Sequence, residues 1–168
     1  MKFFQNLSQK SNSKFILYLT LIAFLGKLPV LIVSDTLFHL VGLGALVELL
    51  EYAQVPEITS TDFVLGVLVA PFIETIIGQW IPINLIGIFF KQDKLKIIGS
   101  ALVFMLIHFP AVTFFPAAFF VGLLFSWAWL QKRKVSLSKA FWTVTFIHAL
   151  HNLLAFGVTF VADSYNIF

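Results

Sequence analysis

The chain has 168 residues, of which 60% are hydrophobic and only 11% are charged. Soluble domains are about 45–50% apolar, so this composition excludes a water-soluble fold and indicates one membrane domain, residues 1–168. The absence of cysteine excludes disulfides, thiolate zinc sites and a cysteine nucleophile. The net charge of +3 collects in short segments typical of cytoplasmic loops rather than of a nucleic-acid surface.

The N-terminal segment is polar and basic from Met1 to Lys14 and then apolar from Phe15 to Gly26. This order resembles the front of a secretory signal, but no small-residue cleavage site follows it. We therefore expect a retained first membrane helix with its N-terminus in the cytoplasm. A cleaved signal peptide is the alternative.

Further apolar runs follow. Each is predicted to be helical, because a segment of about 20 residues must satisfy its own backbone hydrogen bonds inside the bilayer. The expected helices are Phe15–Val33, Thr36–Leu50, Phe63–Gln79 with a continuation through Trp80–Phe90, Ile97–Phe109, Thr113–Leu130 and Ala140–Ala162. The sequence thus predicts an all-α polytopic transmembrane bundle of about five to six helices. Thr36–Leu50 is short, so it is either a full span or a re-entrant or interfacial segment.

The loops between these runs predict the orientation of the bundle. Lys91–Lys96 and Gln131–Lys134 are basic, whereas Glu51–Asp62 contains acids and no Lys or Arg. By the positive-inside rule the two basic loops face the cytoplasm. Prolines at positions 71, 82, 110 and 116 are expected to kink or break helices, and Ala118 and Gly122 offer a small-residue face for close helix packing.

An ionisable side chain inside a membrane helix costs about 2.5–3.5 kcal/mol, so each one needs a partner or a function. Glu74, His108 and His148 occur on three different predicted helices, and Asn152 follows His148 by four residues on the same helix face. With about 1.5 Å of rise per residue, the three ionisable groups lie roughly 14–25 Å from the nearest basic loop. They can therefore share one depth in the membrane.

A single membrane histidine is more often a hydrogen-bonded packing residue than a catalyst, and we interpret His39 and His151 in this way. A carboxylate, two imidazoles and an amide at similar depth instead predict a functional site. Phe104, four residues before His108, is expected to pack against its imidazole ring.

These residues resemble the CPBP intramembrane protease family, which includes the CAAX prenyl proteases and bacteriocin-processing or immunity proteins. The family signatures are Glu-Glu-x-x-x-Arg, Phe-x-x-x-His and His-x-x-x-Asn, in that order on successive helices. The corresponding segments of this chain are Glu74-Thr75-x-x-x-Gln79, Phe104-x-x-x-His108 and His148-x-x-x-Asn152. The second and third signatures are complete, and the resemblance covers about residues 63–156 in order and spacing.

The resemblance implies a helical bundle that encloses a polar site and cleaves peptide bonds at the membrane with an activated water. Glu74, aided by His108, would act as the general base, and His148 and Asn152 would donate hydrogen bonds to the developing oxyanion. Glu74, His108 and His148 could also hold zinc or another divalent metal. A metal-free mechanism uses the same residues, so the cofactor stays open.

Thr75 and Gln79 stand where the family has a second acid and an arginine, which would pair on one helix face. Because both charges are replaced together, we expect Thr75 and Gln79 to hydrogen-bond to each other and to support the site. This predicts an active enzyme, with a noncatalytic relative as the alternative.

The sequence as a whole predicts an intramembrane endopeptidase, a hydrolase of metalloprotease type if a metal takes part. It would be a multi-pass protein of the cell membrane, with lipid and a membrane-associated or lipidated peptide as partners, no nucleic acid, and an open oligomeric state. One alternative is a noncatalytic binding, immunity or scaffold protein of the same family. Another is a small proton-coupled carrier, although the chain lacks the duplicated halves usual in such folds.

Overall fold

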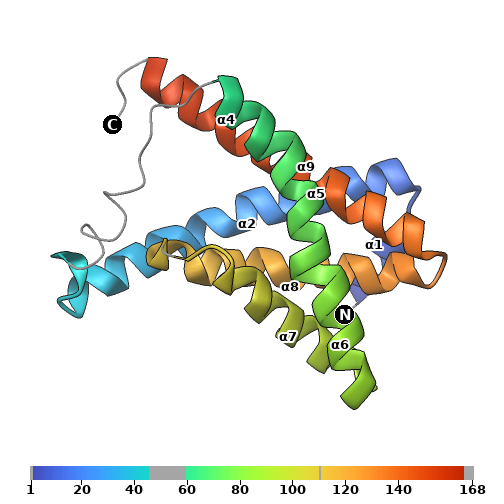
Figure 1. The fold of residues 1–168 in the computed structure, drawn as a ribbon. Helices are drawn as coiled ribbons and strands as arrows, with labels where there is room; N and C mark the ends of the chain where they lie inside the picture. The colour runs from blue at the N-terminus through green and yellow to red at the C-terminus, as the bar shows by residue number, and fades with distance from the viewer. Residues whose placement is uncertain (1, 46–59, 110, 165–168) are drawn as a thin grey trace.

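The computed structural model describes residues 2–45, 60–109 and 111–164. These residues form only helices and turns, which confirms the predicted all-α fold for the described part of the chain. The elements in chain order are α1 (Lys2–Ser8), α2 (Asn12–Leu40), α4 (Ser60–Val64), η1 (Leu65–Val69), α5 (Ala70–Thr75), η2 (Ile76–Trp80), α6 (Ile81–Phe89), α7 (Asp93–Leu106), η3 (Val112–Phe114), α8 (Phe115–Arg133) and α9 (Leu137–Ser164) (Figure 1).

Several of these helices have the length and composition of membrane spans. Within the described residues there are four such stretches, Asn12–Leu40, Leu65–Phe89, Val112–Arg133 and Leu137–Val161. Helix α7 is shorter, with 14 residues, and packs against α6 and α8. Large apolar side chains such as Ile32 and Ile88 are exposed on the outside of the bundle, which suits contact with lipid.

Helix α2 differs from the prediction at its C-terminal end. The sequence predicts a separate segment over Thr36–Leu50, whereas α2 continues through Leu40. The polar Thr36 is accommodated because its Oγ1 donates a hydrogen bond to the Ile32 carbonyl at 2.7 Å. Gly42 follows at φ 78°, a conformation that glycine adopts readily after a helix. The rest of the predicted segment, residues 46–50, lies outside the described residues.

The long helix α4–α6 continues through two prolines that were predicted to kink or break it. The π-helical turns η1 and η2 directly precede Ala70-Pro71 and Ile81-Pro82. Proline has no N–H, and its ring crowds the carbonyl four residues earlier, so a wider π turn relieves this conflict without ending the helix. Pro116 lies in the first turn of α8, where a missing N–H is tolerated. Pro110 lies outside the described residues.

The second π turn is tied to α7 by a buried serine. The turn contains the carbonyl of Gly78, four residues before Pro82, which has no N–H. Ser100 Oγ donates to it at 2.6 Å. A neighbouring membrane helix thus donates a hydrogen bond to the backbone of this turn.

Helices α7 and α8 approach each other closely along small residues. A Cβ atom placed on Gly122 would lie 3.0 Å from the Ala101 Cα, closer than side chains normally pack. Ala118 is fully buried on the same face, and Ser126 Oγ donates to Ser100 Oγ at 2.8 Å one turn further on. The small-residue face predicted from Ala118 and Gly122 is therefore confirmed.

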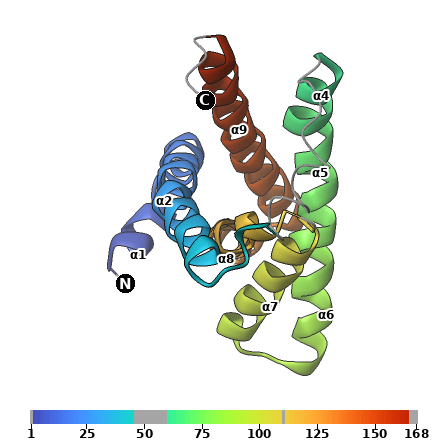
Figure 2. The same ribbon diagram turned by 90° about the vertical axis from the view of Figure 1, so that its left-hand side faces the viewer.

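Helix α8 occupies the centre of the bundle. It packs against α2, α7 and α9, and Figure 2 shows it between these helices. Phe125 and Trp129 of α8 join Phe15 of α2, Phe104 of α7 and Ile147 of α9 in one apolar core. This core fixes the relative positions of the helices that carry the polar residues.

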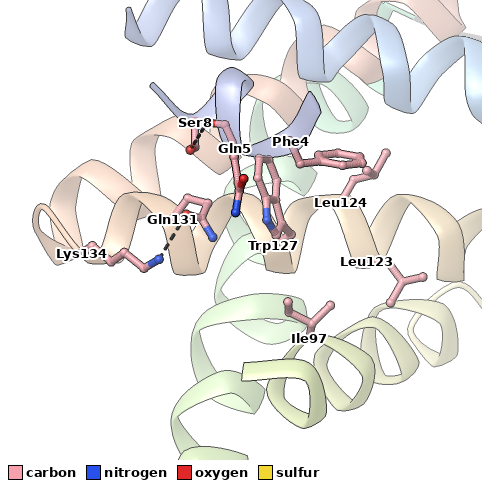
Figure 3. Close-up of a pocket in the computed structure, with 9 residues that line it drawn as sticks. All are labelled: Phe4, Gln5, Ser8, Ile97, Leu123, Leu124, Trp127, Gln131 and Lys134. Atoms are coloured by element: carbon pink, nitrogen blue, oxygen red, sulfur yellow. Dashed lines mark hydrogen bonds between the residues drawn. The ribbon is translucent and has the colours of Figure 1, made fainter. Parts of the chain in front are cut away.

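The basic segments meet at one end of the bundle. A cavity of about 510 Å³ is lined by residues of both predicted basic loops, among them Lys91, Lys96 and Arg133. Helix α1 lies at this end too, with the Phe4 and Trp127 rings 5.0 Å apart beside a cavity of about 690 Å³ between α1, α7 and α8 (Figure 3). This clustering is what the positive-inside rule requires, and the cytoplasmic orientation stays a prediction.

Candidate active site

Glu74, His108 and His148 come together from three parts of the fold. Glu74 lies on α5, His108 in the turn after α7, and His148 on α9. Glu74 Oε2 is 3.7 Å from His108 Nε2 and 3.5 Å from His148 Nε2. The prediction that these groups share one depth is confirmed by this convergence on one carboxylate oxygen.

The backbone of α7 fixes the protonation pattern of His108. Its Nδ1 lies 2.7 Å from the Phe104 carbonyl oxygen, which can only accept, so Nδ1 carries the hydrogen. In the neutral imidazole, Nε2 is then an acceptor, and this is the atom that faces Glu74. The Phe104 and His108 ring centroids are 4.7 Å apart, as the four-residue spacing predicted.

The site is closed around His148 and more open at the other two groups. The His148 side chain is only 3% exposed, whereas those of Glu74 and His108 are 25% and 23% exposed. The Phe104 and Phe125 rings lie 5.5 and 5.0 Å from the imidazole of His148. Apolar rings therefore enclose His148, and the Glu74 Oε2 atom that faces both imidazoles is buried too.

The expected hydrogen bond between Thr75 and Gln79 is not formed. Thr75 Oγ1 donates instead to the Pro71 carbonyl at 2.7 Å, and neither side-chain polar atom of the fully buried Gln79 has a hydrogen-bond partner within the described residues. The reason is the π turn η2, which begins at Ile76 and changes the relation between positions that would share a face in a regular α-helix. The prediction that Thr75 and Gln79 replace the charged pair by bonding to each other is therefore wrong.

Asn152 is held by the first π turn. In this turn the Ala70 N–H donates to the Leu65 carbonyl, five residues back. By the same spacing, the Gly66 carbonyl faces Pro71, which has no N–H to donate. Asn152 Nδ2 donates to the Gly66 carbonyl at 2.8 Å. One amide hydrogen of Asn152 thus connects α9 to the long helix, and its oxyanion role stays a prediction.

Lys27 was not predicted from the sequence, and it contacts His151, three residues after His148. It is buried in α2, with 7% of its surface exposed, and its Nζ lies 3.1 Å from His151 Nε2. The available signal was a charged side chain in the interior of an apolar run. His151, interpreted as structural, is therefore linked to a buried cation, whereas His39 lies 3.7 Å from Asp35 on the exposed surface of α2.

The described residues do not form a recognisable metal centre. Among them, no group of three or more His, Asp or Glu side chains is arranged to hold a metal ion. The metal-ligand role considered for Glu74, His108 and His148 therefore finds no support in their arrangement.

One family model matches most of the segment that carries the polar residues. A family model described as "Type II CAAX prenyl endopeptidase Rce1-like" matches residues 56–154, more than half of the chain. The matched segment contains all the residues compared above with the three signatures. No curated protein and no solved structure matches the chain. The chain therefore belongs to the Rce1-like family of type II CAAX prenyl endopeptidases.

Proposed function

We propose that the chain is an intramembrane endopeptidase that hydrolyses peptide bonds of membrane-associated or lipidated peptides with a water activated by Glu74. The observation that carries this proposal is the approach of two imidazole nitrogens to one carboxylate oxygen inside a bundle of membrane helices. Membership in a protease family supports the same class of reaction.

Glu74 and His108 are suited to hold the attacking water from two sides. Both Glu74 Oε2 and the Nε2 of neutral His108 are acceptors, so at 3.7 Å they do not bond to each other. One water can donate a hydrogen to each of them. Glu74 would then take a proton as the water oxygen attacks the carbonyl carbon of the peptide. It would return this proton to the amide nitrogen as the C–N bond breaks, which leaves a carboxylic acid and an amine.

His148 and Asn152 are suited to stabilise the oxyanion that this attack creates. An Nε2–H of His148 would point into the site, and Asn152 has one amide hydrogen beyond the one bonded to Gly66. Each such donor contributes about 3–4 kcal/mol where water is excluded, and His148 is nearly fully buried.

The proposal is tested by incubating the purified protein in lipid with a library of membrane peptides and identifying products by mass spectrometry. Glu74→Gln should abolish cleavage while leaving the folded yield unchanged, because the amide keeps the shape but cannot take the proton. Asp35→Asn is the matched control, since it neutralises the exposed carboxylate that lies 3.7 Å from His39. Cleavage that persists in Glu74→Gln would end the general-base assignment.

A noncatalytic function in the same family is the second candidate. It is favoured by the altered first signature, in which Thr75 and Gln79 replace a charged pair and Gln79 has no side-chain hydrogen-bond partner among the described residues. Peptide binding by the unmodified protein without any cleavage would support this candidate over the enzyme.

A further inference from the structure

The ammonium group of Lys27 is buried in the bundle, and the described residues offer it no acidic partner. Its one described hydrogen bond goes to His151, a residue that brings no negative charge. In the part of the chain that the structure describes, no carboxylate lies within ion-pair distance of Lys27. Buried charges in proteins are normally paired, so a cation in this position favours binding of an anion.

Lys27 borders the Glu74 site on the α2 side. Its Nζ lies 5.9 Å from the centre of the Phe114 ring, and that ring is 5.3 Å from the ring of His108. Its hydrogen-bond partner His151 lies on α9 three residues after His148. Phe114 thus contacts both Lys27 and His108, so a ligand at Lys27 is separated from the His108 imidazole by one ring.

The depth of Lys27 distinguishes between possible anions. It lies near the middle of α2, roughly 20 Å along the helix from either end, whereas lipid phosphates lie outside the hydrocarbon core of about 30 Å. A lipid headgroup would have to leave the membrane surface to reach this ammonium. A peptide bound for cleavage at Glu74 is already at the required depth.

We infer that Lys27 is a specificity-determining residue that binds a carboxylate of the peptide substrate next to the scissile bond. The inference rests on the proposed function for the position of the peptide, and it adds the chemical group that the site selects. The carboxylate is either the C-terminal one of the peptide or the side chain of an Asp or Glu. In both cases the ammonium donates charge-assisted hydrogen bonds to it, while His151 holds the ammonium in place.

Binding rather than cleavage provides the test, so that it does not depend on turnover. The full chain carrying Glu74→Gln is placed in nanodiscs of phosphatidylcholine and titrated with a fluorescent membrane peptide as its C-terminal acid and as its C-terminal amide. A third peptide has the amide end and one Asp, with Asn in its matched partner. We expect a peptide with a carboxylate to bind about ten- to hundredfold more tightly than its uncharged form.

Substitution of the lysine should remove this preference. Lys27→Met should bring the ratio of the two affinities close to one, and Lys27→Arg should retain part of it. Lys132→Met is the matched control, because Lys132 is equally buried but lies 3.8 Å over the Phe15 ring. It should leave the ratio unchanged.

Three results would overturn the inference: equal binding of all charged and uncharged peptides, binding of none of them, or a preference that persists in Lys27→Met. The comparison of peptides on the protein that retains Lys27 needs no substitution at this position, so it decides the question even if Lys27→Met folds poorly. If the unmodified protein cleaves no peptide but the preference for a carboxylate is observed, the proposed reaction is rejected and the carboxylate-binding site at Lys27 is supported.

Discussion

Replacing Asn152 by alanine removes the only described donor to the Gly66 carbonyl. The carbonyl cannot find a substitute within its own helix, because Pro71 occupies the position whose N–H would face it. Pro71→Ala restores this N–H. We therefore expect Asn152→Ala to destabilise the native protein far more than it destabilises the Pro71→Ala variant.

The size of the effect follows from the environment of this hydrogen bond. A buried carbonyl without a donor costs about 1–3 kcal/mol, and side-chain hydrogen bonds between membrane helices average about 0.6 and reach about 1.7 kcal/mol. The bond is 2.8 Å long and partly buried, so Asn152→Ala should lower the free energy of unfolding by about 1–1.5 kcal/mol. In the Pro71→Ala background, the loss of unfolding free energy caused by Asn152→Ala should be smaller by about 1 kcal/mol. This difference is the coupling energy of the double-mutant cycle formed by the two substitutions.

The assay is equilibrium unfolding of the four proteins of this cycle in mixed micelles, followed by the fluorescence of the four tryptophans. Asn84→Ala is the matched control, since Asn84 Nδ2 donates to the Trp80 carbonyl at 2.7 Å on the exposed surface. Its loss should stay within about 0.5 kcal/mol. Equal destabilisation by Asn152→Ala in both backgrounds would refute the argument that proline creates the need for this donor.

Activity measured on the same proteins separates the two roles of Asn152. If the second amide hydrogen serves the oxyanion, Asn152→Ala lowers kcat by about 10²–10³ in both backgrounds. Pro71→Ala should then restore stability without restoring turnover. Recovery of both together would show that Asn152 acts only through the position of α9.

Three further predictions concern the support, the orientation and the cofactor of the site. Gln79→Leu should leave the free energy of unfolding unchanged or raise it by about 1 kcal/mol, because the buried amide has no described partner; a clear loss of stability in mixed micelles would mean that Gln79 is bonded. Cysteines placed at Lys94 and Arg133 should resist membrane-impermeant labelling of intact cells, and strong labelling at either position would reverse the orientation. Turnover should persist after incubation with a chelator of divalent metals, and a loss restored by added zinc would replace the metal-free mechanism.

The sequence by itself determined the class of fold and the main polar residues of the site. A composition with 60% hydrophobic residues forces backbone groups in the bilayer to pair within helices, so the all-α bundle follows from composition and run length. The cost of a charge in the membrane singles out Glu74, His108 and His148. Regular helix spacing also predicted the contact of Phe104 with His108, because residues four apart meet on one face.

Tertiary structure decided which partners these side chains have. The spacing of Thr75 and Gln79 suggested a pair, but the π turn η2 between them changed the face. The Gly78 carbonyl inside this turn accepts a hydrogen bond from Ser100 of the neighbouring helix α7. The bond from Asn152 to Gly66 and the contact of Lys27 with His151 join residues 86 and 124 positions apart. No local pattern encodes such contacts, because they form only when the central helix α8 sets the distances between α2, α9 and the long helix α4–α6.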